Sequence, residues 1–210
     1  MIIYLVIIGL TVCISFLLNY FVAIPVCGYP YNFWQSCLYI LISIVVVIVI
    51  DAILAFVIRR LPNKWFHFKK RLFKIRKWEK KFYEKLKIKK WKDLIPELGQ
   101  FTNFSKSKVT DPTNNEYVER FLLEICYGEV IHYTSILFGF LIIFLFNLKW
   151  CWCIGIPIAI ANGIINMLSL MILRYNRPKL MILHERNERT QKRKLEARNE
   201  ENAEDVNDKN

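Results

Sequence analysis

Glu129 and His132 are the residues whose types and spacing best suit chemistry. They are three positions apart, so in a helix they lie on one face. A run of apolar residues follows from Ile136. Histidine can accept a proton at neutral pH, and a carboxylate bonded to one ring nitrogen would raise the basicity of the other. The pair suits a general base that deprotonates a hydroxyl attacking an acyl carbonyl. An interfacial histidine without a catalytic role is an equal alternative, and nearby Glu124 is either a second orienting group or an ordinary helix charge.

A second polar group, Arg174-Tyr-Asn-Arg177-Pro178, ends the last apolar run. The planar guanidinium of arginine binds two oxygens of a phosphate or carboxylate at once, and Asn176 offers both a donor and an acceptor. These residues therefore fit an anion-binding site. They equally fit a basic anchor at a membrane surface, with Pro178 as a helix stop or bend.

Two further polar residues, Asp51 and Asn166, lie inside apolar runs. A charge near the middle of a membrane costs about 2.5–3.5 kcal/mol, so such residues usually face a cavity or a partner. Asp51 is either protonated or paired with Asn166. Both residues are candidates for lining a substrate site, and helix packing is the alternative.

The cysteines and histidines show no spacing typical of a zinc site, and the chain has no glycine-rich phosphate loop. Cys27, Cys37, Cys151 and Cys153 flank short connections, where a disulfide is possible although the spacing does not identify one. Cys126 is expected to be a small packing residue rather than a nucleophile.

Four apolar runs must position these groups. They cover residues 2–24, 38–58, 132–146 and 150–173, and each approaches the roughly 20 residues that a bilayer span needs. No charged residue and no histidine occurs before Asp51. We therefore predict an all-α integral membrane protein with about four transmembrane helices. Residues 1–184 form one membrane domain, and 185–210 a charged tail, helical at first and then partly disordered.

The distribution of charge predicts the orientation. Residues 59–92 contain sixteen Lys and Arg against two Glu, and the segment after Leu173 is again basic. Basic loops face the cytoplasm, so both termini and the central segment are expected there, in the cell membrane.

Aromatic residues alternate with basic ones in the first part of the predicted interfacial segment, residues 59–131. This pattern is typical of amphipathic helices lying on anionic headgroups, and a solvated helix packed on the bundle is the alternative. Nucleic-acid binding uses similar residues, but the position between membrane spans argues against it. A helix is expected to resume near Glu116 and to continue through Glu129 into the third span.

These pieces resemble the glycosyl-4,4'-diaponeurosporenoate acyltransferase family of carotenoid biosynthesis. The resemblance covers roughly Leu61 to Leu180, with Tyr133 and Lys179 as departures from the family pattern. It rests on Leu61-Pro-Asn-Lys-Trp-Phe66, Lys90-Trp91-Lys92, Glu124, Glu129-Val-Ile-His132, Asn166 and Arg174-Tyr-Asn-Arg-Pro-Lys-Leu180.

The resemblance implies transfer of a fatty acyl group to a sugar hydroxyl of a glycolipid, a glycosyl carotenoid or a related lipid. No bound cofactor or metal is expected; acyl-CoA or an acyl carrier protein would be the co-substrate. The expected catalytic residues are His132, Glu129 and Glu124. The expected substrate-binding residues are Arg174, Asn176, Arg177, Asn166, Asp51 and Trp91. Another membrane lipid-modifying enzyme, of methyltransferase or reductase type, and a non-catalytic lipid-binding scaffold remain alternatives.

Overall fold

The computed structural model describes residues 2–23, 32–95, 111–145 and 151–207, and these residues form helices and no strand. Four helical segments are long and apolar enough to cross a membrane: Ile2–Val22, Phe33–Arg59, Asn115–Phe144 and Cys153–Glu200. Their cores are α1 (Ile2–Leu18), α3 (Phe33–Arg59), α6 (Asn115–Gly139) and α8 (Ile156–Asn207). The predicted all-α membrane fold is confirmed.

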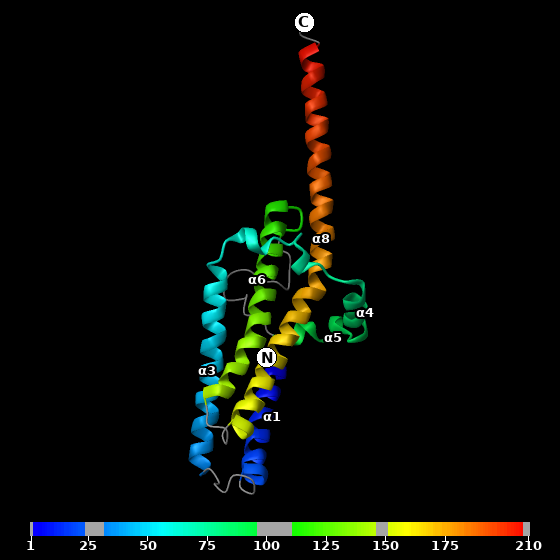
Figure 1. Cartoon of the computed structure of the whole chain (residues 1–210). Helices are drawn as coiled ribbons and strands as arrows, with labels where there is room; N and C mark the ends of the chain where they lie inside the picture. Colours follow the sequence, from blue (N-terminus) through cyan, green and yellow to red (C-terminus); the bar gives the residue numbers. More distant parts are fainter. Residues whose placement is uncertain (1, 24–31, 96–110, 146–150, 208–210) are drawn as a thin grey trace.

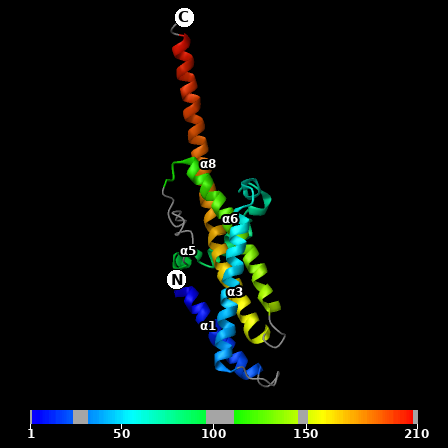
Figure 2. The ribbon, with the colours of Figure 1, turned by 90° about the vertical axis from the view of Figure 1, so that its left-hand side faces the viewer.

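The four long helices run side by side as an elongated bundle (Figures 1 and 2). We call the end where α1 begins and α3 finishes the basic end, because residues 59–95 lie there; the opposite end is the tip end. α6 and α8 pack along each other, and α3 packs on α6. The side chains that α1 and α3 turn outwards are mostly exposed and apolar, as expected for helices that face lipid.

Helix α6 begins well before the predicted third span. The side chain of Asn114 caps it by accepting a hydrogen bond from the backbone N–H of Tyr117 at 3.2 Å. The helix then continues through Glu129 and His132 to Gly139. The expectation that a helix resumes near Glu116 is confirmed, and residues before 132 complete the span.

Helix α8 contains 52 residues and passes through Pro178. A proline inside a helix lacks the N–H that would bond to residue i−4, here Arg174, and commonly bends the helix. Figure 1 shows that α8 changes direction along its length, and the helix continues past Pro178, so this proline does not stop it. At 1.5 Å per residue the helix is about 78 Å long, and its second half extends beyond the bundle. The expected tail is helical to Asn207, and 208–210 lie outside the described residues.

Short helical turns fold the basic segment against the bundle. They are η2 (Asn63–Phe66), η3 (Arg71–Phe73), α4 (Lys77–Lys85), α5 (Ile88–Trp91) and η4 (Lys92–Leu94). Phe66, Phe68 and Phe73 are buried in one core with residues of α6 such as Phe121. These aromatic anchors help to hold the basic segment in place.

A glycine permits close packing nearer the tip end. A Cβ atom at Gly139 of α6 would overlap the side chain of Asn162 on α8. The Asn162 amide donates to the carbonyl of Ser135 at 3.3 Å, so the two helices approach through a small residue and a buried hydrogen bond. Among the predicted outer cysteines, Cys37 is a free thiol, the thiol of Cys153 donates to the carbonyl of Leu18 at 3.7 Å, and Cys27 lies outside the described residues.

Candidate active site at the basic end of the bundle

A buried carboxylate, Glu129, lies between two buried arginines. Its Oε2 is 2.9 Å from Nη1 of Arg174 and its Oε1 is 2.7 Å from Nη1 of Arg177. Glu129 is 1 % exposed and Arg177 is fully buried. Direct ion pairs between α6 and α8 therefore bring the Arg174–Arg177 motif to the depth of Glu129.

Glu79 of α4 completes this charge cluster. Its Oε2 accepts hydrogen bonds from Nε and Nη2 of Arg174 at 2.8 and 2.7 Å, and the hydroxyl of Tyr83 donates to the same oxygen at 3.3 Å. Burial raises the pKa of Tyr83 to about 12, so this hydroxyl remains a donor at neutral pH. Two arginines and two glutamates leave the cluster neutral, which is how buried charges persist. Local patterns did not identify Glu79, although it is one of only two acids within residues 59–92.

The burial of the arginines changes the role expected for them. Arg174 is 5 % exposed and faces two carboxylates, and the guanidinium of Arg177 lies over the ring of Phe73 at 5.7 Å. These contacts join α4, α6 and α8, whereas a phosphate-binding arginine would have to face an open site. Asn176, between them in sequence, is half-buried.

A second polar layer lies deeper in the bundle and contains His132. Its Nδ1 is 2.8 Å from Oδ1 of Asn166 on α8, and Nδ2 of Asn166 donates to Oδ2 of Asp51 on α3 at 3.2 Å. The side-chain oxygen of Asn162 also accepts from this amide, at 2.9 Å. The predicted pairing of Asp51 with Asn166 is present, and Asn166 of α8 joins His132 of α6 to Asp51 of α3.

This arrangement determines the state of the imidazole ring. Because Nδ2 of Asn166 donates to Asp51, the atom facing His132 is the carbonyl oxygen, which can only accept. His132 therefore carries its hydrogen on Nδ1, and the neutral ring has its lone pair on Nε2. The orienting partner is Asn166, not Glu129 as expected, since both oxygens of Glu129 face guanidinium groups. An amide that orients a basic histidine also occurs in Cys-His-Asn catalytic sites.

Two other predicted residues lie elsewhere. Glu124 accepts a hydrogen bond from Arg59 at 3.0 Å at the partly exposed end of α3, so its partner is an arginine. Trp91 donates from Nε1 to the carbonyl of Leu86 at 3.0 Å, within the basic segment, and packs against the core cluster that contains Ile172 of α8. The contact between Arg59 and Glu124 joins α3 to α6, and the packing of Trp91 holds the basic segment on the bundle.

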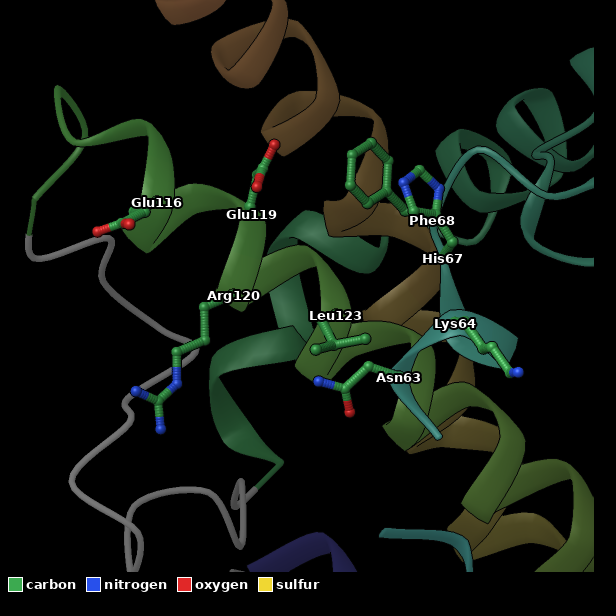
Figure 3. Close-up of a pocket in the computed structure, with 8 residues that line it drawn as sticks. All are labelled: Asn63, Lys64, His67, Phe68, Glu116, Glu119, Arg120 and Leu123. Carbon is green, nitrogen blue, oxygen red and sulfur yellow. The ribbon is translucent and has the colours of Figure 1, made fainter. Parts of the chain in front are cut away.

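A pocket of about 370 Å³ opens at the basic end, between η2 and the first turns of α6. Figure 3 shows its polar side chains, with Asn63 and Lys64 on one side and Glu116 and Arg120 on the other. Leu123, which lines it, precedes His132 by nine residues, or about 14 Å along α6.

Four helices able to cross a membrane, joined by paired charges and by the hydrogen-bonded residues His132, Asn166 and Asp51, define a multi-pass helical membrane protein with a polar interior site. The chain belongs to the glycosyl-4,4'-diaponeurosporenoate acyltransferase family, whose family model matches residues 62–186. That range is more than half of the chain and includes Glu79, His132, Asn166 and both arginines. No curated protein and no solved structure matches the chain.

Proposed function

We propose that this protein transfers a fatty acyl group from a thioester donor to a sugar hydroxyl of a membrane glycolipid, with His132 as the general base. The observation that carries the proposal is the hydrogen bond between His132 Nδ1 and Asn166 Oδ1, backed by Asp51. This hydrogen bond places the hydrogen on Nδ1, so Nε2 is the basic atom of the ring. The family name of the chain describes an acyltransferase.

The reaction follows from this tautomer. Nε2 of His132 takes the proton of the sugar hydroxyl as its oxygen attacks the thioester carbonyl, and a tetrahedral intermediate forms. When the intermediate collapses, the carbon–sulfur bond breaks and the imidazolium returns the proton to the leaving thiolate. The products are an ester and a free thiol. Asp51 supports the positive ring through Asn166, much as a buried carboxylate supports a catalytic histidine elsewhere.

The pocket beside η2 and α6 is our candidate for the polar part of the donor. Lys64 and Arg120 line it together with the acids Glu116 and Glu119, so the attraction of an anionic donor would come from the basic segment around the pocket. A pantetheine arm is long enough to cover the distance along α6 to His132. Acyl-CoA and an acyl carrier protein both carry this arm and negative charge, and the basic end would attract either one.

The charge distribution supports a position of the basic end at the cytoplasmic face of the cell membrane. The basic segment suits the cytoplasmic side, where acyl thioesters are available, and both termini would lie there. On α4, Trp78 and Phe82 are exposed, whereas Glu79 and Tyr83 on the adjoining face are buried. An apolar stripe flanked by lysines suits contact with anionic lipid. The acceptor class, a glycosyl carotenoid or related glycolipid, rests on the family name.

The test is acyl transfer by membranes that contain His132→Ala, with a labelled acyl donor and with glycolipids identified by mass spectrometry. We expect loss of the acylated glycolipid at normal protein abundance. Thr134→Ala is the matched control, because the Thr134 hydroxyl bonds only to carbonyls of its own helix in the described contacts. Asn166→Ala should retain less activity than this control, because the ring loses its orienting acceptor.

Two results would contradict the proposal. Unchanged acylated product with His132→Ala would remove the histidine from the chemistry. Incorporation of label from a methyl or hydride donor, but not from an acyl donor, would favour a methyltransferase or reductase. A scaffold predicts that the variants lower the amount of protein and never yield a folded, inactive chain.

A further inference from the structure

Three side chains with metal-binding atoms meet where the first turns of α6 lie beside α8, near the point at which α8 leaves the bundle. They are Glu119 of α6 and His184 and Glu188 of α8, and their nearest ligand atoms all lie within 4.8 Å of one another. Nε2 of His184 is 3.2 Å from Oε1 of Glu188 and 3.7 Å from Oε1 of Glu119. Figure 3 shows the Glu119 carboxylate directed towards the ribbon of α8.

His184 is held in the orientation that a metal ligand requires. It is 1 % exposed, and its Nδ1 lies 2.7 Å from Oδ1 of Asn115. An amide oxygen only accepts, so Nδ1 carries a hydrogen, and in the neutral ring Nε2 carries the lone pair. The ring of Phe68 packs edge-on at 5.2 Å and limits rotation. Metal-binding histidines are typically fixed in this way by a bond to the other ring nitrogen.

The Nε2 atom itself is buried and has no hydrogen-bond partner among the residues that the structure describes. A buried polar atom without a partner is costly, and here it faces two carboxylates. A lone pair cannot bond to carboxylate oxygens, which are also acceptors, but a cation between them would satisfy all three groups.

The distances suit such a cation. Two ligand atoms about 2.1 Å from a metal at a tetrahedral angle lie roughly 3.4 Å apart. This is close to the distances from Nε2 of His184 to Glu188 and Glu119, 3.2 and 3.7 Å. His184 and Glu188 are four residues apart, a spacing that places two ligands on one helix face. Glu119 and Glu188 have side chains 51 % and 45 % exposed, so an ion can enter from water.

Ion pairing offers a different account of the same cluster. A protonated His184 would attract both carboxylates, and Nζ of Lys69 lies 3.9 Å from Oε1 of Glu188. In that case the cluster would carry its own positive charge and would not bind a metal.

We propose that Glu119, His184 and Glu188 bind a divalent first-row transition-metal ion of the Zn²⁺ or Mn²⁺ type. One imidazole and two carboxylates match the ligand preference of these ions, whereas Mg²⁺ and Ca²⁺ prefer oxygen alone. Three protein ligands leave at least one position for water. The ion ties the first turns of α6 to the extension of α8 beyond the bundle. Local spacing did not indicate the site, because Glu119 and His184 are far apart in the chain.

The experiment uses the full chain, purified in detergent without a histidine tag and treated with EDTA. Isothermal titration with Zn²⁺ and metal analysis after dialysis give the stoichiometry, and Mg²⁺ is the comparison ion. We expect one Zn²⁺ per chain and a higher unfolding temperature when Zn²⁺ is present. Glu119→Gln and Glu188→Gln alter exposed side chains and should fold; each should weaken binding at least ~10-fold.

Glu185→Gln is the matched control, because Glu185 is an exposed acid beside His184 that does not belong to the cluster. It should bind Zn²⁺ as the wild type does. Equal affinity in Glu119→Gln, Glu188→Gln and the control would overturn the proposal, as would the absence of stoichiometric binding to the wild type. The second result would support the ion-pair account.

Discussion

Replacing Glu129 with Gln should lower the stability of the fold, whether or not it also affects the reaction. The change keeps the size of the side chain and removes its charge, so Arg174 and Arg177 lose the carboxylate that they share. Glu79 still balances Arg174. Arg177 is fully buried, and it would then be a buried cation without a counter-ion.

Breaking a buried ion pair from one side costs about 3–5 kcal/mol, because the remaining charge stays desolvated. For a chain of this length, 1 kcal/mol corresponds to about 2–4 °C in unfolding temperature. The expected loss is therefore about 6–20 °C. The control is Glu124→Gln, since the Arg59–Glu124 pair has side chains 45 % and 23 % exposed. Exposed pairs contribute about 0.2–1 kcal/mol, which corresponds to less than about 4 °C.

The assay is the unfolding temperature in detergent, measured from the fraction that stays monodisperse on size-exclusion chromatography after heating. A double variant, Glu129→Gln with Arg177→Met, removes both members of one pair and restores neutrality. It should be more stable than Glu129→Gln alone, which is the sign of a coupled pair in a double-mutant cycle.

Two outcomes would refute this reasoning. Equal unfolding temperatures for Glu129→Gln and Glu124→Gln would mean that Glu129 does not neutralise buried charge. A double variant in which the two losses simply add would mean that Arg177 does not depend on Glu129.

Three further predictions concern other parts of the chain. Burial raises the pKa of Tyr83 from 10.0 to about 12, so its neutral hydroxyl stabilises the fold fully below pH 10, and this contribution is lost as the pH rises towards 12. In that window the free energy of unfolding should fall by about 1.4 kcal/mol per pH unit. Tyr83→Phe should abolish this fall, measured by unfolding at stepped pH. Gly139→Leu should separate α6 from α8 at Asn162 and lower the unfolding temperature by several degrees, whereas equal stability would contradict the contact. A nitroxide at Phe82→Cys should be accessible to oxygen from lipid and one at Glu84→Cys to water-soluble reagents, because the two positions are 200° apart on α4; equal accessibility would exclude interfacial docking.

Much of the fold follows from the sequence alone. The absence of charge before Asp51 and the length of the apolar runs require membrane helices, because about 20 apolar residues match the thickness of a bilayer. The sequence also predicted that a helix resumes near Glu116, and the Asn114 cap is the physical reason for that start. It left open whether Pro178 stops or bends the last helix; α8 continues through this residue because a single proline removes one backbone bond without ending a long helix.

The contacts within the candidate site follow only in part from the sequence. The sequence by itself determined that Glu129, His132, Asn166 and Arg174 lie near the same end of the bundle, since the order of the spans brings α6 and α8 together. Only the tertiary structure decided the partners. The rotation of α6 about its own axis places Glu129 beside the two arginines and His132 beside Asn166. The position of α4 places Glu79 beside Arg174. Residues three apart on a helix are 60° from each other, so one face in the sequence pattern became two different environments in the packed bundle.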